Sequence, residues 1–301
     1  MKLPQAVEVT EVGPRDGFQN LQTRIQTEDK LCIIDGLAEC GFKKIEVTSF
    51  VHPKASPQMD DAAEVLRAIK NKYPSRFKCT ILASTLSGAQ LALDLGADEI
   101  AFVISASDPH NLENTKNTVE QSLYALASLC KIKGKALVRL AIATAFSCPF
   151  IGVMPSKNVM RLLEAGMTAG ADEVALADTL GTANPLQVES LLDQLIPHYG
   201  NNIVLHLHDT YGMGMANVVT CLNMGITRFE ASVGGLGGYQ FAPGATVNIA
   251  TEDLINMLHM MNIYTGIDND KLISTCQTVE RLLKVTLPGH ILRSKRTAMI
   301  K

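Results

Sequence analysis

Two histidines one residue apart carry the strongest chemical signal in the sequence. His206 and His208 follow the apolar run Ile203-Val204-Leu205, which is typical of a buried β-strand. Side chains two residues apart along a strand point to the same face. Two imidazoles on one face indicate a divalent-metal site that carboxylates elsewhere in the chain would complete. The structural alternative is a pair of hydrogen-bonded histidines near a strand end.

Further polar residues fall where other predicted strands end. They are Arg15 and Asp16, Glu46 and Thr48, and Asp178 and Thr179. Each has a structural alternative: Arg15 and Asp16 as a surface turn pair, Glu46 as the partner of a structural arginine, and Asp178 as the cap of a following helix. Their joint occurrence at strand ends favours a shared site over separate structural roles.

The elements that would position these residues form one repeated pattern. Short apolar, β-branched runs alternate with longer segments of helical period, which is typical of parallel βα units. The predicted strands are 7–12, 44–48, 78–82, 99–104, 136–143, 173–177, 203–208 and 228–232. The predicted helices are 27–40, 59–72, 88–95, 118–133, 157–169, 185–198, 215–224, 251–261 and 271–284. Eight such units predict a closed (β/α)8 TIM barrel.

The strand ends of such a barrel meet on one rim, where barrel enzymes carry their active sites. We therefore expect the polar residues to converge there. We assign residues 1–265 to the barrel, including a glycine-rich loop at 234–246, and residues 266–301 to a short C-terminal helical cap. Gly41, Gly96, Gly170 and Gly225 follow predicted helix ends, where a left-handed residue is favoured.

Composition narrows the class of protein. The 301 residues carry a formal net charge of -3, which argues against a nucleic-acid-binding surface. We find no apolar stretch of about 18 residues and no signal peptide. The seven cysteines are scattered and lack CxxC spacing, which is typical of reduced thiols. We expect a cytoplasmic protein that binds neither membrane nor nucleic acid.

Several segments, in chain order, resemble the 3-hydroxy-3-methylglutaryl-CoA (HMG-CoA) lyase family of the DRE-TIM metallolyase group. They are EVGPRDGFQN (11–20), IEVTSFV (45–51), CPF (148–150), ADTLG (177–181), HLHDTYG (206–212) and ATEDL (250–254). The resemblance covers nearly the whole chain. It implies a metal-dependent lyase that takes an acyl-CoA substrate and forms a homodimer.

The resemblance also implies ligands for the metal, namely Asp16, His206, His208 and Asn248. Mixed imidazole and oxygen ligands with open positions suit Mg²⁺ or Mn²⁺, although Zn²⁺ would also bind such a set. In the implied reaction, retro-Claisen (retro-aldol) cleavage of a 3-hydroxyacyl-CoA releases a keto acid, and protonation of the remaining enolate gives acetyl-CoA.

Roles for other residues follow from the same resemblance. Arg15 would stabilise the enolate oxygen and Glu46 would orient Arg15. Asp178 would support the substrate or take part in proton transfer. Substrate binding is assigned to three further residues of these motifs: Gln19, Thr48 and Thr179.

The glycine-rich loop departs from the family pattern. The family has Gly-Gly-Leu-Gly-Gly-Cys-Pro-Tyr, with the cysteine taking part in proton transfer, whereas this chain has GGLGGYQF at 234–241. Tyr239 thus replaces the cysteine. A phenol titrates near 10 and a thiol near 8.5, so Tyr239 is a poorer base at neutral pH but still a competent acid.

Several interpretations remain open. In the first, Tyr239 is the proton donor for a related substrate such as citramalyl-CoA or another branched 3-hydroxyacyl-CoA. Alternatively, Cys148 or a metal-bound water handles the proton and HMG-CoA remains the substrate; the structural alternative for Cys148 is a small buried residue. A third interpretation is a catalytically inactive, ligand-binding barrel. A fourth is a synthase of the same group that condenses acetyl-CoA with a 2-oxo acid, but such chains usually carry further C-terminal domains.

Overall fold

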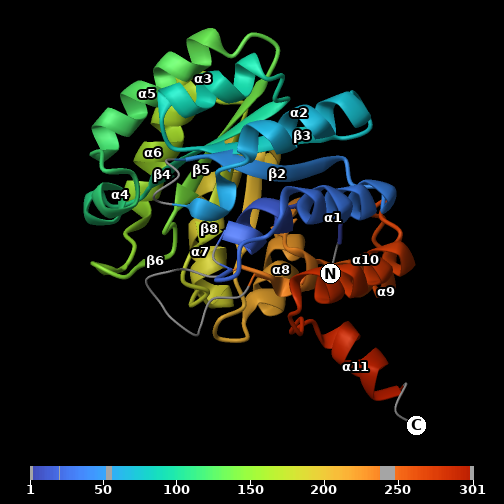
Figure 1. The fold of residues 1–301 in the computed structure, drawn as a ribbon. Coiled ribbons are helices and arrows are strands. Elements are labelled where there is room, and N and C mark those ends of the chain that lie inside the picture. The colour runs from blue at the N-terminus through green and yellow to red at the C-terminus, as the bar shows by residue number, and fades with distance from the viewer. Residues whose placement is uncertain (1–2, 20, 52–55, 238–247, 299–301) are drawn as a thin grey trace.

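The computed structural model describes residues 3–19, 21–51, 56–237 and 248–298. Within these residues, eight parallel strands close into a barrel in the order β1-β10-β9-β8-β5-β4-β3-β2 (Figure 1). The strands are β1 (Glu8–Glu11), β2 (Lys44–Phe50), β3 (Lys78–Ala83), β4 (Glu99–Ser105), β5 (Leu137–Ala143), β8 (Glu173–Asp178), β9 (Ile203–Leu207) and β10 (Arg228–Ala231). The predicted (β/α)8 barrel is confirmed, and each strand lies where the apolar pattern placed it.

Helices surround the barrel on its outside (Figure 1). They are α1 (Thr27–Glu39), α2 (Ala62–Lys72), α3 (Leu86–Asp94), α5 (Val119–Ile132), α6 (Ser156–Ala169), α7 (Pro185–Tyr199), α8 (Gly214–Asn223), α9 (Thr251–Met260) and α10 (Asn269–Leu283). Helix α10 packs against α1 and α9. The division of the chain at residue 265 stays a prediction.

Local sequence signals explain several helix boundaries. A capping box formed by Asn184 and Gln187 starts α7, with Pro185 in its first turn, where the missing amide hydrogen costs nothing. Gly170 ends α6 with a φ of 102°, a left-handed conformation that glycine adopts without steric penalty.

Two helices were not predicted from the sequence. Helix α4 (Asp108–Thr115) buries His110, Asn111 and Thr115, so its inner face is polar and shows no apolar period. The sequence did contain an N-cap residue for this helix, Ser107, whose side chain accepts a hydrogen bond from the His110 amide. Helix α11 (His290–Ala298) extends away from the barrel (Figure 1), and Asp253 accepts hydrogen bonds from the first amides of that helix.

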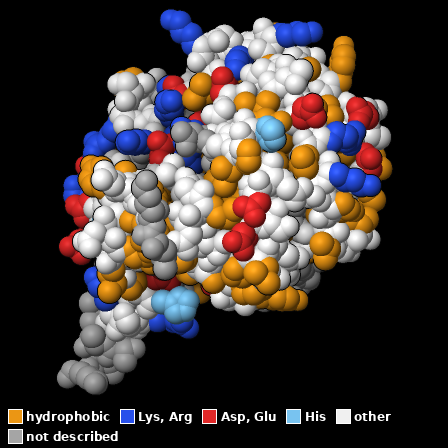
Figure 2. Space-filling view, turned by 180° about the vertical axis from the view of Figure 1, so that it is seen from behind, with side chains coloured by type: hydrophobic (Ala, Val, Ile, Leu, Met, Phe, Trp, Pro, Cys, Tyr) orange, Lys and Arg blue, Asp and Glu red, His pale blue; other side chains and the backbone are white. Residues whose placement is uncertain are grey.

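The surface carries mixed charge. On the face drawn in Figure 2, Lys and Arg side chains are interspersed with Asp and Glu side chains and with hydrophobic ones. This distribution is consistent with the small net charge of -3. No helix within the described residues has the length and apolar character needed to span a membrane.

Candidate active site

Three of the predicted metal ligands converge at the carboxyl end of the barrel. His206 lies near the end of β9 and His208 directly follows its last residue. The Nε2 atoms of the two imidazoles lie 3.0 Å apart. Asp16 belongs to a turn of π-helix at Gly13–Gly17, directly after β1. Its Oδ2 atom lies 3.9 Å from Nε2 of His206. Candidate ligand atoms of the three residues all lie within 4.8 Å of one another.

Asn248 joins this cluster from the segment after the glycine-rich loop. Its Nδ2 donates hydrogen bonds to Oδ2 of Asp16 at 2.6 Å and to the Leu236 carbonyl at 2.9 Å. Its Oδ1 is buried and has no hydrogen-bond partner within the described part of the chain. A buried acceptor without a partner is rare in proteins, so this oxygen is available to a ligand.

Gly237 makes room for the Asn248 amide. A Cβ atom at this position would collide with Nδ2 of Asn248 and lie 3.3 Å from Oδ2 of Asp16. The φ of Gly237 is 136°, a conformation that side-chain-bearing residues rarely adopt. A glycine is therefore required here by both space and backbone conformation.

These donors fit a divalent cation. Two neighbouring ligand atoms in an octahedral shell, each about 2.1 Å from the ion, lie about 3 Å apart, which is the separation of the two Nε2 atoms. Two imidazoles, one carboxylate and one amide oxygen are borderline to hard ligands. The Oδ1 of Asn248, which has no partner among the described residues, would complete the predicted ligand set, and its role as a metal ligand stays a prediction.

The protonation states of His208 and Asp16 also favour metal binding. Burial and the neighbouring His206 ring lower the pKa of His208 to about 3, so that imidazole is neutral at physiological pH. Burial by itself would raise the pKa of Asp16, but Arg15 and both imidazoles lower it to about 2. A neutral imidazole and an ionised carboxylate are the forms that bind metals.

Arg15 lies at the edge of the same cluster. Its Nε donates to Oε1 of Glu46, and its Nη1 donates to Oδ1 of Asp16. The structure thus places Glu46 against Arg15, as the family resemblance implied. The other Glu46 oxygen lies 3.7 Å from Nη2 of Arg139. Glu46 therefore also has the partner that the structural alternative predicted.

Asp178 ends β8 beneath the loop that leads to α7. Its carboxylate accepts hydrogen bonds from the backbone amides of Thr182 and Ala183, at 3.3 and 3.0 Å. These contacts agree with the structural alternative, in which Asp178 shapes the approach to a helix. Burial raises the pKa of Asp178 to about 6. Its role in proton transfer stays a prediction.

The predicted substrate-binding residues differ in whether their side chains already have partners within the protein. The Thr179 hydroxyl accepts a 2.8 Å hydrogen bond from the Thr144 amide, and the buried Thr48 hydroxyl contacts the Met59 sulfur at 3.5 Å. By contrast, Oε1 of Gln19 is buried and lacks a partner among the described residues. Gln19 is thus the member of this group whose side-chain oxygen remains available to a substrate.

Of the two candidate proton donors, Cys148 and Tyr239, the structure describes only Cys148. Cys148 lies in the short strand β6 (Ser147–Cys148), which pairs with β7 (Gly152–Val153). Its sulfur contacts the Ser107 hydroxyl at 3.1 Å and is buried, as expected for a small structural residue. Tyr239 lies outside the described residues.

Two charged residues inside the barrel were not predicted from the sequence. Arg139 is 1% exposed and Glu230 6% exposed, and Oε2 of Glu230 lies 2.9 Å from Nδ1 of His206. Both residues lie within predicted strands, and the strand that carries Arg139 is otherwise apolar. A charged residue in the middle of a barrel strand was the available signal, because such positions are usually aliphatic.

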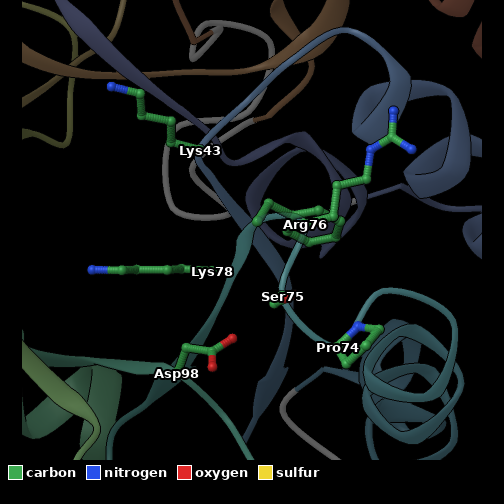
Figure 3. A pocket seen from close by; sticks show the side chains of 7 residues that line it. Lys43, Pro74, Ser75, Arg76, Lys78 and Asp98 are labelled. Carbon is green, nitrogen blue, oxygen red and sulfur yellow. The ribbon is translucent and has the colours of Figure 1, made fainter.

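A pocket lies at the opposite end of the barrel, where β2 and β3 begin. It has a volume of about 340 Å³ and is lined by Lys43, Pro74, Ser75, Arg76, Phe77, Lys78 and Asp98 (Figure 3). Asp98 is paired with Lys70 at 2.9 Å, and Arg76 with Glu39 at 2.8 Å. In barrel proteins this end serves stability and the opposite rim serves catalysis, so we place the active site at the histidine cluster.

Comparison with known proteins gives a consistent result. The family model described as HMGL-like matches residues 6–279. The hydroxymethylglutaryl-CoA lyase of Bacillus subtilis is 40% identical over 97% of this chain and 98% of its own length. The crystal structure of the HMG-CoA lyase from that organism superimposes with a TM-score of 0.94, covering 98% of this chain and all of the other.

A second solved structure includes ligands. The HMG-CoA lyase of Acinetobacter baumannii, in complex with coenzyme A and 3-methylmalate, is 38% identical and has a TM-score of 0.91. The match covers 96% of this chain and 95% of that one. The similarity therefore extends across the barrel and all the strands that carry the histidine cluster.

Proposed function

The chain belongs to the HMGL-like family, and from this membership we propose that it is a divalent-metal-dependent lyase that cleaves HMG-CoA to acetyl-CoA and acetoacetate. The observation that carries the proposal is the buried cluster of Asp16, His206 and His208. The unpartnered Oδ1 of Asn248 completes the cluster, and Arg15 lies at its edge. The resident ion is proposed to be Mg²⁺ or Mn²⁺ rather than Zn²⁺, since half of the donors are oxygens.

The first chemical demand is removal of the substrate's hydroxyl proton. A bound divalent cation supplies the Lewis acid that lowers the pKa of that hydroxyl. We assign the base to Asp178, because its pKa of about 6 suits proton uptake near neutral pH. A carboxylate has about four acceptor positions, so its bonds to two backbone amides leave capacity for a substrate hydroxyl.

The second demand arises when the carbon–carbon bond breaks. The electron pair of that bond moves into the thioester, and acetoacetate leaves while an enolate remains. We assign stabilisation of the enolate oxygen to Arg15, whose guanidinium has five N–H donors. Glu46 and Asp16 fix its orientation through one hydrogen bond each. Protonation of the enolate carbon then gives acetyl-CoA, and we assign this proton to Tyr239.

A second substrate is supported by one specific feature. Tyr239 replaces the cysteine of the family pattern with a larger side chain, which would change the shape of the acyl pocket. Citramalyl-CoA, which would be cleaved to acetyl-CoA and pyruvate, is the alternative that we propose on this ground. We further propose a cytoplasmic homodimer, supported by the family resemblance and by seven free cysteines.

The test is an assay of purified protein with Mg²⁺ or Mn²⁺ against both thioesters, with separate detection of acetyl-CoA, acetoacetate and pyruvate. We expect turnover of HMG-CoA that a chelator abolishes and added metal restores. Turnover of citramalyl-CoA alone would establish the alternative substrate. A Tyr239→Cys variant in the same assay shows whether residue 239 decides between them. Absence of cleavage of either thioester by metal-loaded protein would contradict the proposal.

A further inference from the structure

Arg139 lies inside the barrel on β5, beneath the proposed active site. It is 1% exposed, and three carboxylates surround its guanidinium. Its Nη1 forms an ion pair with Oε1 of Glu230, its Nε lies 3.2 Å from Oε1 of Glu99, and its Nη2 lies 3.7 Å from Oε2 of Glu46. One cation thus holds residues from three different strands.

Two of these carboxylates use their second oxygen in the proposed active site. Oε1 of Glu46 accepts the hydrogen bond from Nε of Arg15, and Oε2 of Glu230 lies 2.9 Å from Nδ1 of His206. Each carboxylate therefore has one oxygen on Arg139 and the other on a residue that faces the substrate or the metal. The arrangement links Arg15 and His206 through a single buried guanidinium.

We propose that Arg139 is a positioning residue that holds Arg15 through Glu46 and His206 through Glu230. This inference rests on the proposed function, because it assumes that His206 binds the metal and Arg15 the enolate. A carboxylate on the far ring nitrogen fixes the tautomer and orientation of a metal-binding histidine, and loss of such a contact typically lowers metal affinity by 10–100-fold. A planar guanidinium can contact two carboxylates at once, whereas an ammonium acts as a single point of charge.

Other cations of the barrel are not equivalent to Arg139. Lys44 lies 2.8 Å from both Glu99 and Glu173, and Arg228 lies 2.7 Å from Glu173. These contacts lie at the end of the barrel where the strands begin, opposite the proposed active site. Arg228 shares β10 with Glu230 and its side chain is 32% exposed, so it provides a control for the loss of an arginine–carboxylate pair away from the proposed active site.

The test compares Arg139→Lys, Arg139→Met and Arg228→Met in the full-length protein. We expect Arg139→Lys to fold, because it keeps a buried positive charge. It should bind Mn²⁺ 10–100-fold more weakly in titrations followed by electron paramagnetic resonance. Arg139→Met should show at least the same loss if it folds. Arg228→Met should lose thermal stability and keep the Mn²⁺ affinity of the unchanged protein.

A second readout needs neither metal nor substrate. The ¹⁵N chemical shifts of the His206 ring report which nitrogen carries the proton, and a His206→Asn variant assigns the signals. In the metal-free protein we expect proton density at Nδ1, facing Glu230. We expect Arg139→Lys to shift the signals towards a mixture of tautomers, whereas Arg228→Met should not.

A double-mutant comparison tests the branch through Glu46. If Arg139 acts on Arg15 through Glu46, the kcat of the Glu46→Gln, Arg139→Lys double variant should equal that of Glu46→Gln alone, provided that both are measured at saturating Mn²⁺, where weaker metal binding through Glu230 does not contribute. Wild-type Mn²⁺ affinity and unchanged His206 signals in Arg139→Lys would overturn the inference and leave Arg139 a purely structural ion pair. Failure of the proposed function looks different: the unchanged protein would bind Mn²⁺ but cleave neither thioester.

Discussion

Asn248 donates a 2.6 Å hydrogen bond to Asp16 across 232 positions of the sequence. This contact joins the beginning of the barrel to its end, because Asp16 follows β1 and Asn248 precedes α9. It also fixes the orientation of the amide. With Nδ2 facing Asp16 and the Leu236 carbonyl, Oδ1 is the atom left for a metal.

Replacement of Gly237 tests this arrangement without removing any ligand. Gly237→Ala would place a Cβ against Nδ2 of Asn248 and strain a φ of 136°. We expect at least a tenfold loss of Mn²⁺ affinity, measured by isothermal titration calorimetry. The matched control is Gly134→Ala, which also has a positive φ but nothing within 4 Å of the added Cβ. Equal affinities in the two variants would contradict the orientation assigned to Asn248.

His208→Ala should remove metal binding and lyase activity together. The imidazole is neutral, because burial and His206 lower its pKa to about 3, and its Nε2 lies 3.0 Å from that of His206. Mn²⁺ titration and acetyl-CoA release measure the two properties on the same sample. His198→Ala, on the exposed side of α7, should change neither. Retention of both properties in His208→Ala would exclude the proposed metal site.

Arg15→Met should separate metal binding from catalysis. Arg15 contacts Asp16 and Glu46 but is not itself a ligand, so we expect Mn²⁺ affinity to stay within a few fold. Loss of an oxyanion partner typically costs about 3 kcal/mol or more, so kcat should fall by at least about 100-fold. The surface variant Arg24→Met, whose side chain is 59% exposed, serves as the control. A kcat near that of the control would remove Arg15 from the mechanism.

Glu11 should make the folded state less stable as the pH rises. Burial raises its pKa from 4.5 to about 7, so the folded protein binds a proton that the unfolded chain releases. The contribution is fully present below pH 4.5 and is lost as the pH rises through about 7. The shift corresponds to a change in the free energy of unfolding on the order of 3 kcal/mol.

Urea unfolding between pH 4.5 and 8 measures this effect. Glu11→Gln keeps a side-chain oxygen that can accept hydrogen bonds from the Gly13 and Val233 amides, and it should flatten the fall in stability over that range. Glu189→Gln, at an exposed position of α7, should leave the pH profile unchanged. An identical slope in Glu11→Gln and the unchanged protein would show that Glu11 is not the group responsible.

Local rules were sufficient to predict the barrel and the histidine pair. The pleat of a strand places His206 and His208 on one face wherever the strand lies. The alternation of strands with helices leaves few topologies other than a parallel barrel. The ends of its strands then bring Asp16 to the histidines. Asn248 followed from the family motif, not from a pattern of the residues themselves.

Only the tertiary structure showed which partner each charged side chain has. The period of a strand places Glu46, Arg139 and Glu230 inside the barrel, but their contacts depend on how the strands are staggered when the barrel closes. The contacts of Asp178 could not be predicted either, because its backbone partners belong to the following loop. Helix α4 was not predicted because its buried face is polar. Sequence periodicity determines the face of an element, whereas the packing of distant elements determines which atoms meet there.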